Sequence, residues 1–433
     1  MTTDIANNDA GLLLGEDWRS PLETSVRGCI RGLIEELLEE ELSAALGRAR
    51  YVRLRTAPAS PVDGCEGLGD DTEPAAAPAD APAASKGTRN GLRERTIMGT
   101  FGNVTIAVPR ARIETADGKT TEWNNKTLPR YRRRTKEVDA LIAGAYLSGT
   151  NTRRVGRALV ALFRGAISKS VVSRVWRKIK GDWDNWNKRD LSKSDIVRLI
   201  LDGTVVKVRL DRKATSVSLL VVLGITRDGR KVLLAVKNMG GESEAAWRTI
   251  LDDLTARGLR KPELAIVDGA PGLEKALVTL WSDLPIQRCT VHKLRNLIAH
   301  APKTLADEIS ADFTDMMYAK NAKEVEKRRK SFLKKWRVKC EAVATSLEEA
   351  GDRLFTFTRL PVAQWKSART TNAIERLHEE FKRRIKTQCV LPSAETAAML
   401  FWALLASGQI ILRKVDGWQT LPVPLTAPID LAA

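Results

Sequence analysis

The chain has 433 residues, with 71 Lys and Arg against 53 Asp and Glu, so its formal net charge is +18. A hydrophobic fraction of 43% with 29% charged residues is typical of globular proteins and excludes wholesale disorder, and the length suggests two to four domains. The longest mostly apolar stretch, Ala397 to Leu412, contains polar residues and is shorter than a membrane span. We therefore expect no membrane association, and a cytoplasmic protein with reduced thiols, because a secretory signal is lacking and the cysteines are scattered.

The positive charge is unevenly distributed along the chain. Residues 1–86 contain 8 Lys and Arg and 16 Asp and Glu, a net charge of −8, so residues 87–433 carry +26. A basic surplus spread over a folded body favours a polyanion as partner, because each phosphate contact releases condensed counterions. Nucleic acid is the leading candidate, and the alternative is that the charge serves solubility alone.

The N-terminal region, residues 1–56, is predicted to hold one long helix. Apolar residues recur at spacings of three and four from Pro21 to Leu46, which indicates an amphipathic helix. Such a helix either pairs with another chain, as a dimerisation element, or docks on its own domain. Residues 57–85 are rich in Ala and Pro and are predicted to be a linker. In residues 86–134, alternating apolar residues predict a small β-hairpin around the turn at Gly99 to Asn103.

Residues 135–190 are predicted to be helical and to contain a helix-turn-helix. Two short helices, Thr152 to Phe163 and Lys169 to Ile179, flank a turn that contains Gly165, as in DNA-binding domains of this type. The alternative is an ordinary helical hairpin with a solvated basic face. If the motif binds DNA, the residues that would contact phosphates or base edges are Lys169, Ser170, Ser173, Arg174, Arg177 and Lys178.

The pattern changes after residue 190, and its order of elements predicts an α/β, ribonuclease H-like catalytic domain. Three apolar, β-branched runs predict an antiparallel meander, and they cover Ile196 to Leu210, Ser216 to Ile225 and Lys231 to Val236. A helix from Ser243 to Arg257 follows, and then two buried strands that each lead into a helix. The first part of this domain covers residues 191–300. An all-helical, basic insertion covers residues 301–365, the second part of the domain covers residues 366–415, and residues 416–433 form a C-terminal tail. The second part is predicted to hold helices at about Asn372 to Lys386 and Ala394 to Leu412.

Three acidic residues are candidates for chemistry. Asp202 lies within the first apolar strand, and Asp268 follows the strand Leu264 to Val267. If these strands are parallel neighbours, the two carboxylates lie side by side and repel each other unless a cation such as Mg²⁺ lies between them. Glu375 lies in the first turn of a helix, capped by Thr371 or Asn372, where an acidic residue is also favoured by the helix dipole.

Two further patterns lie near these acids. Cys289 and His292 form a Cys-x-x-His pair, but a structural zinc needs two more ligands, so we expect a hydrogen-bonding role beside the active site. The basic run Lys382, Arg383 and Arg384 either binds phosphates or pairs with the acidic residues one turn earlier.

The chain resembles the bacterial Mutator-type insertion-sequence transposases, members of the DDE transposase superfamily, from about Lys86 to Leu412. No single string is decisive, but their order and placement together are specific. The strings are Arg89-Asn90-Gly91, Val108-Pro109-Arg110, Leu201-Asp202-Gly203 with Lys207-Val208-Arg209, Val267-Asp268-Gly269 with Pro271-Gly272-Leu273, Arg288-Cys289 with Val291-His292-Lys293-Leu294-Arg295-Asn296, and Thr371-Asn372-Ala373-Ile374-Glu375.

The resemblance implies that Asp202, Asp268 and Glu375 bind two catalytic Mg²⁺ ions, with Mn²⁺ able to replace them. It also places Cys289, His292, Asn372 and Arg369 at motif positions around the site, the last two without an assigned role. It implies a dimeric, nucleoid-associated enzyme that binds the terminal inverted repeats of its own element, cuts double-stranded DNA and joins the 3′-hydroxyl to target DNA. The alternatives are a DNA-binding regulator that no longer cuts, and a stand-alone metal-dependent nuclease.

Overall fold

The computed structural model describes residues 21–51, 87–114, 118–128, 133–148, 152–163, 167–210, 213–386, 391 and 393–426. The chain divides into two compact units. The first comprises Met1–Ile142 and Arg153–Lys169, and the second Ala143–Thr152 and Ser170–Ala433. The predicted linker at residues 57–85 lies outside the described residues. Among the helices that are described, none combines the length and the apolar character that a bilayer crossing requires.

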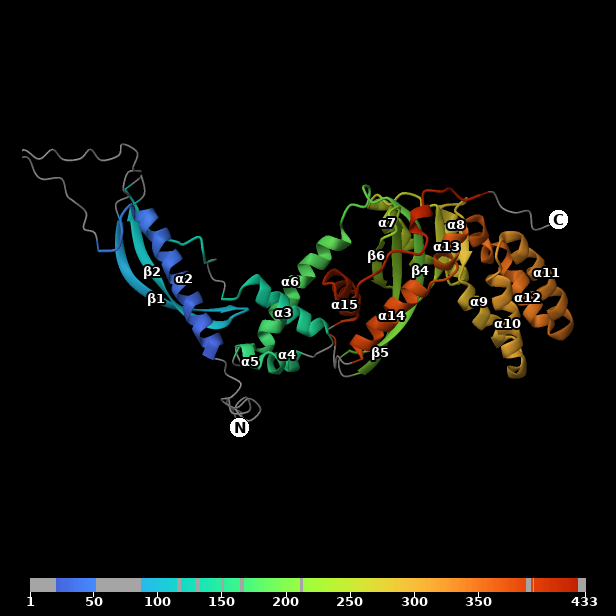
Figure 1. Cartoon of the computed structure of the whole chain (residues 1–433), viewed down its shortest axis with the longest axis horizontal. Coiled ribbons are helices and arrows are strands. Elements are labelled where there is room, and N and C mark those ends of the chain that lie inside the picture. Colours follow the sequence, from blue (N-terminus) through green and yellow to red (C-terminus); the bar gives the residue numbers. More distant parts are fainter. Residues whose placement is uncertain are drawn as a thin grey trace, which may run out of the picture. The chain divides into compact units, whose positions relative to one another are not determined.

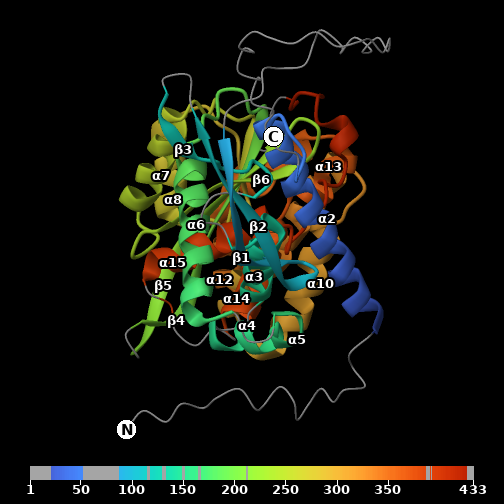
Figure 2. The same cartoon turned by 90° about the vertical axis from the view of Figure 1, so that its left-hand side faces the viewer.

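The first unit contains a three-stranded antiparallel sheet with one long helix. Strands β1 (Gly87–Gly99) and β2 (Gly102–Glu114) form the predicted hairpin, and β3 (Thr120–Glu122) pairs with β2. Helix α2 (Pro21–Leu46) lies beside this sheet, as Figures 1 and 2 show. It buries Leu38, Leu42 and Leu46, and Arg89 of β1 pairs with Glu39 of the helix. The helix therefore docks on its own domain.

Only part of the apolar stripe on α2 is covered in this unit. Leu22, Val26, Leu33 and Leu37 are 70%, 44%, 56% and 42% exposed. These residues follow one another at helical spacings, so they form a second apolar strip on the helix, separate from the three buried leucines. The amphipathic pattern in the sequence thus contains two sets of residues, of which one packs on the sheet.

Four helices follow the sheet; the helix predicted from Thr152 to Phe163 is divided into two, and the one predicted from Lys169 to Ile179 continues to Asn187. The four are α3 (Lys136–Leu147), α4 (Thr152–Ala158), α5 (Val160–Phe163) and α6 (Lys169–Asn187). Helix α6 buries Val171, Val172, Val175 and Trp183 along one side. Because α4 and α5 belong to the first unit and almost all of α6 to the second, the helix-turn-helix stays a prediction.

The second unit is built on a five-stranded mixed sheet of order β6-β5-β4-β7-β8. Strands β4 (Ile196–Leu210), β5 (Lys213–Thr226) and β6 (Lys231–Asn238) form the predicted antiparallel meander, and β7 (Leu264–Val267) and β8 (Ile286–Arg288) run parallel to β4. The alternation of side chains along β4 separates two cores. The mixed α/β class predicted from the sequence is confirmed.

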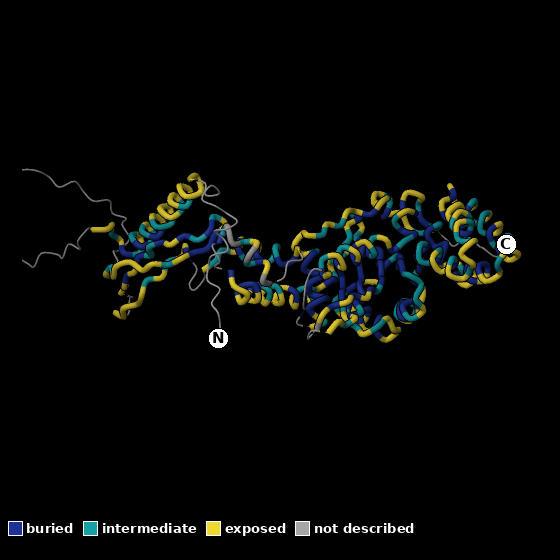
Figure 3. The backbone as a smooth tube through the Cα atoms, turned by 90° about the horizontal axis from the view of Figure 1, so that it is seen from below, coloured by how far each residue is buried: buried dark blue, intermediate teal, exposed yellow. Residues whose placement is uncertain are grey.

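Helices cover both faces of this sheet. Leu199 and Leu201 of β4 belong to one core together with Trp247 of α7 (Glu244–Ala256) and Leu273 of α8 (Pro271–Leu280). Ile200 belongs to the opposite core, which includes residues of α14 (Asn372–Ile385) and α15 (Ala394–Ala406). Figure 3 shows that buried segments are concentrated in this part of the unit. Asp202 has the same parity as Ile200 and therefore points to the α14 side.

The remaining helices connect β8 to α14. Helix α9 (Thr290–Ala299) follows β8, and then come η2 (Lys303–Leu305), α10 (Ala306–Met317), α11 (Ala322–Lys339), α12 (Glu341–Ala350), η3 (Gly351–Leu354), η4 (Thr356–Arg359) and α13 (Val362–Ala368). Figure 1 shows α9 to α12 gathered at one end of the unit. Helix α15 is buried along almost its whole length, as expected for its apolar sequence, but it ends at Ala406 rather than at Leu412. Ser407 is its C-cap and Gly408 has a φ of 74°, a conformation that ends the helix.

Candidate active site

Asp202 and Asp268 lie side by side because their strands pair in parallel. Leu201 of β4 is opposite Val267 of β7, so the next residue on each strand carries one of the two carboxylates. Asp268 is the first residue after β7, and its Oδ1 accepts a hydrogen bond of 2.9 Å from the N–H of Ala270. Burial and the neighbouring negative charge of Asp202 raise the pKa of Asp268. The side-by-side placement predicted for these two acids is present.

A third carboxylate, that of Glu242, lies near the two aspartates and was not predicted from the sequence. Glu242 lies in the loop between β6 and α7, and its side chain packs against the α-carbon of Gly203. The residue as a whole is exposed, yet partial desolvation together with the charges of Asp268 and Asp202 raises the pKa of its carboxylate. Strand β6 runs in the same direction as β4 and β7, so a carboxylate just after β6 reaches the same edge of the sheet.

Asp202 is buried and lies next to a histidine of α14. Its Oδ2 lies 3.3 Å from Nδ1 of His378, which is also buried. His378 is three residues after Glu375 on the same helix, so both side chains are on one side of α14. The sequence reasoning missed His378 as well, although its position one turn beyond Glu375 was a usable signal.

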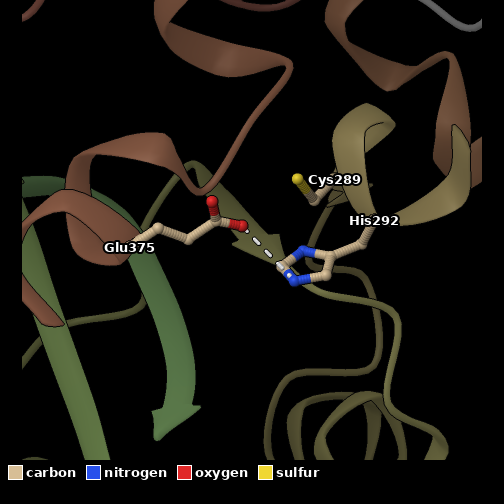
Figure 4. Close-up of side chains that lie close together, drawn as sticks. All are labelled: Cys289, His292 and Glu375. Atoms are coloured by element: carbon tan, nitrogen blue, oxygen red, sulfur yellow. Dashed lines mark ion pairs between the residues drawn. The ribbon is translucent and has the colours of Figure 1, made fainter. Parts of the chain in front are cut away.

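The side chain of Glu375 contacts His292 and lies close to Cys289, the two residues of the Cys-x-x-His pair. Its Oε1 lies 3.3 Å from Nε2 of His292 and 3.8 Å from Nη1 of Arg295. Figure 4 shows that Glu375 approaches from α14, while Cys289 and His292 project from the beginning of α9. Within the described part of the chain, one group of three potential metal ligands has its atoms within 4.8 Å of one another, and it consists of Cys289, His292 and Glu375.

Thr371 holds this second group together. Its N–H donates to Sγ of Cys289 at 3.4 Å, and its hydroxyl lies 3.5 Å from Nδ1 of His292 and 3.5 Å from Oε1 of Glu375. Thr371, one of the two predicted candidates, is the N-cap residue of α14, but its side chain does not cap the helix. The Thr371 hydroxyl contacts His292 and Glu375 instead of the backbone of the helix.

The charges of Cys289 and His292 depend on each other. The hydrogen bond with Cys289, together with the negative charges of Glu375 and Asp202, outweighs desolvation and raises the pKa of His292 to about 9. Burial alone would raise the pKa of the Cys289 thiol, but hydrogen bonds with His292 and Thr371 lower it overall. The His292 ring also interacts electrostatically with Asp268, so it links the two groups of side chains.

Backbone contacts fix the two groups relative to each other. The N–H of Cys289 donates to the carbonyl of Val267 at 2.7 Å, which ties the beginning of α9 to the end of β7. The N–H of Thr290 donates to the carbonyl of Arg369 at 2.9 Å, which ties α9 to the turn before α14. Asp268, Cys289 and Glu375 therefore project from connected segments, although they lie far apart in the sequence.

Arg369 and Asn372 have different surroundings. The Arg369 guanidinium is buried, donates to the carbonyl of Met317 and lies 4.1 Å from the ring centre of Tyr318, so it anchors α10 to the turn before α14. Asn372 is exposed and lines a cavity of about 720 Å³ beside α14. The cavity is also lined by two acidic residues, Glu380 and Asp416, and by five basic residues, namely Lys231, Lys366, Arg376, Arg413 and Lys414.

The residues predicted to bind DNA are mostly on the surface. All six on α6, from Lys169 to Lys178, are exposed, opposite the buried valines. On α14, Lys382 is exposed, whereas Arg383 and Arg384 both pair with Glu380. These two arginines therefore pair with an acidic residue one turn earlier, which was the alternative to phosphate binding.

Comparison with known proteins identifies the family of this chain. The model of the family "Transposase, Mutator family" matches residues 70–410. The transposase for insertion sequence element ISRM5 of Rhizobium meliloti (strain 1021) is 30% identical over 318 residues, which cover 73% of this chain and 78% of the relative.

Two further relatives are similar to the chain over almost the same length. The transposase for insertion sequence element IS256 in transposon Tn4001 of Staphylococcus aureus is 31% identical, over 73% of this chain and 80% of the relative. The transposase for insertion sequence element IS905 of Lactococcus lactis subsp. lactis (strain IL1403) is 28% identical, over 72% and 77%. The chain belongs to the Mutator family of transposases.

Proposed function

We propose that the chain is a DDE-type DNA transposase that binds the terminal inverted repeats of an insertion sequence, cuts DNA there and transfers the 3′-hydroxyl end to target DNA. The observation that carries this proposal is the pairing of Asp202 and Asp268 on neighbouring parallel strands, with Glu375 on a helix that packs on β4, in a chain of this family. We further propose that the sheet and its helices form a ribonuclease H-like domain, and that residues 301–365 are its helical insertion.

The carboxylates fit a pair of Mg²⁺ ions, which Mn²⁺ could replace. Burial, together with repulsion from the neighbouring carboxylates, raises the pKa of Asp268 and of Glu242, and hard oxygen ligands are those that Mg²⁺ prefers. Asp202, Asp268 and Glu375 would hold the ions. When bound, such ions activate the attacking oxygen and stabilise the leaving oxygen of an in-line displacement at phosphorus.

The reaction needs no covalent bond to the protein. In the first step a water molecule attacks a phosphodiester, which frees a 3′-hydroxyl and leaves a 5′-phosphate. In the second step this hydroxyl attacks a phosphodiester of the target and displaces its 3′-oxygen. The contribution of the chain is to hold the carboxylates in place: His378 contacts Asp202, the Ala270 N–H binds Asp268, and Thr371 and His292 contact Glu375.

The exposed basic residues are the proposed contacts with double-stranded DNA. Arg174, Arg177 and the four other predicted contact residues on α6 are exposed to solvent. Lys382 is exposed on α14, the helix that carries Glu375. The cavity beside α14, where basic residues outnumber acidic ones five to two, offers further contacts for the phosphate backbone. We also propose a homodimer, with the exposed strip of Leu22, Val26, Leu33 and Leu37 on α2 as its contact.

The test is cleavage of a duplex that carries the ends of the element encoding this chain, with Mg²⁺ and the full-length protein. Wild-type protein should produce a nick with a 3′-hydroxyl, and Asp268→Asn should not. Asp252→Asn is the matched control, because Asp252 is an exposed residue of α7 that pairs with Arg248.

Each result has a distinct meaning. Equal cleavage by wild type and Asp268→Asn would contradict the assignment of the site. End-specific binding without Mg²⁺-dependent cleavage would favour the non-cleaving regulator. Cleavage that is independent of the end sequence would favour a stand-alone nuclease.

A further inference from the structure

The group formed by Cys289, His292 and Glu375 has a different chemistry from the aspartate pair. Its three potential ligand atoms are one sulfur, one imidazole nitrogen and one carboxylate oxygen, all within 4.8 Å of one another. Figure 4 shows them converging from two helices. Mg²⁺ binds oxygen ligands, whereas Zn²⁺ binds sulfur, imidazole nitrogen and carboxylate oxygen together. The donor set is therefore suited to zinc rather than to the ions of the proposed catalytic site.

The surroundings already orient these ligands as metal sites require. Nδ1 of His292 faces the hydroxyl of Thr371, which leaves Nε2 directed at Glu375. The N–H of Thr371 donates to Sγ of Cys289 at 3.4 Å. Hydrogen bonds of this kind, from residues behind the ligands, fix the imidazole and the thiolate in known metal sites. Thr371 and Cys289 are fully buried, so this support is rigid.

The distances allow a zinc ion with small adjustments. Around a tetrahedral zinc the ligand atoms are about 3.5 Å apart, since each is about 2.0–2.3 Å from the metal. Nε2 of His292 and Oε1 of Glu375 are already 3.3 Å apart. Three protein ligands leave the fourth position to water, which is the arrangement of an open zinc site rather than of a structural one.

We propose that Cys289, His292 and Glu375 form an exchangeable site for a zinc-class divalent ion. The sequence argued against a structural zinc because the Cys-x-x-His pair lacked two ligands. The fold supplies a third ligand from α14, and an open site needs no fourth. Because Glu375 is shared, an ion bound here takes this carboxylate away from the Mg²⁺ ions, so zinc acts as an inhibitor. The inhibition, but not the binding, rests on the proposed function.

Binding can be measured without DNA and without activity. Titration of the full-length protein with Co²⁺ should produce a sulfur-to-cobalt charge-transfer band and the intense visible bands of a tetrahedral ion, at one equivalent per chain. Cys289→Ser should abolish the charge-transfer band, and Glu375→Gln should weaken binding by at least about tenfold. Added Zn²⁺ should bleach the spectrum of the wild-type protein.

The matched control is Cys29→Ser, because Cys29 is an exposed thiol on α2. This variant should bind Co²⁺ as wild type does. Circular dichroism of every variant checks that it is folded. A spectrum in Cys289→Ser equal to that of wild type, or only the weak bands of a six-coordinate ion, would overturn the site.

The inhibition has its own readout. Zn²⁺ should inhibit Mg²⁺-dependent cleavage by wild type, and the concentration for half inhibition, relative to the zinc-free activity of each variant, should rise at least tenfold in Cys289→Ser. Co²⁺ binding with no such shift would overturn the inhibition and leave the metal site. Absence of all cleavage would contradict the proposed function, while the Co²⁺ spectra still decide whether the site exists.

Discussion

Nδ1 of His378 lies 3.3 Å from Oδ2 of Asp202, and both side chains are buried. This contact joins the central strand β4 to α14, the helix that also carries Glu375. One histidine thus connects the two segments that supply the first and the last of the proposed metal ligands. The Nε2 atom of the same ring is buried and has no hydrogen-bond partner within the described residues.

His378 is a positioning residue, and its replacement should affect stability and metal use together. His378→Ala leaves the buried Asp202 carboxylate without this partner, so we expect a loss of about 1–3 kcal/mol in the free energy of unfolding. His378→Asn places an amide N–H near Nδ1 and removes the unpartnered Nε2, so it should lose less. Urea unfolding and the Mg²⁺ concentration for half-maximal cleavage measure the two effects. Equal behaviour of the Ala and Asn variants would argue against a hydrogen-bonding role.

Asp268→Asn should separate stability from activity. The pKa of Asp268 is raised by burial and by the charge of Asp202, so removal of its charge relieves repulsion in the absence of metal. We expect cleavage to be lost while the melting temperature without Mg²⁺ is equal to or above that of wild type. Wild type should gain stability when Mg²⁺ is added, because the ion binds only the folded state, and the variant should gain less. Equal stabilisation of both proteins by Mg²⁺ would contradict metal binding at Asp268.

Glu242→Gln should raise the Mg²⁺ requirement without abolishing cleavage. The Glu242 carboxylate interacts electrostatically with Asp202 and Asp268, so it contributes to the negative charge that attracts the ions. Cleavage measured against Mg²⁺ concentration should show a several-fold increase in the half-maximal concentration. Glu244→Gln is the control, since Glu244 is an exposed residue in the first turn of α7. The same shift in both variants would indicate a general charge effect.

Gly203→Ala should act through Glu242. A β-carbon at Gly203 would collide with the end of the Glu242 side chain, which is flexible and can move aside. The fold should therefore be kept, while the Mg²⁺ requirement rises as in Glu242→Gln. In the double variant the two effects should not add, because both remove the same interaction. Additive effects in the double-mutant cycle would show that the two changes act independently.

Arg174→Ala and Arg177→Ala on α6 should weaken DNA binding at every sequence by a similar factor. Both residues are exposed, and each phosphate contact that is lost should lower the slope of log affinity against log salt by about 0.9. Arg383→Ala should have a smaller effect, because this residue already pairs with Glu380 at 2.7 Å. Fluorescence anisotropy at several salt concentrations measures both the affinity and the slope. Equal losses for α6 and Arg383 would contradict this distinction.

The sequence predicted the elements of the second unit well because their signals are local. The boundaries of β4 and β7 were predicted without error, since polar residues flank each of these two apolar runs. Ser243 was placed at the beginning of α7, where it is the N-cap. The C-terminal end of α15 was placed too late because residues 410–412 are again apolar, while the left-handed Gly408 ends the helix.

By itself, the sequence determined the mixed α/β class, the places of Asp202 within one apolar strand and Asp268 after another, and the place of Glu375 on its helix, because side-chain alternation and helix signals are local patterns. The parallel pairing of β4 with β7, which puts the two aspartates side by side, came from the tertiary structure. The tertiary structure alone decided that Glu242 and His378 join the aspartates, and that Glu375 meets Cys289 and His292. These contacts join residues from separate elements. Their distances depend on how β6, α9 and α14 pack around β4 and β7, which no periodicity within one segment encodes.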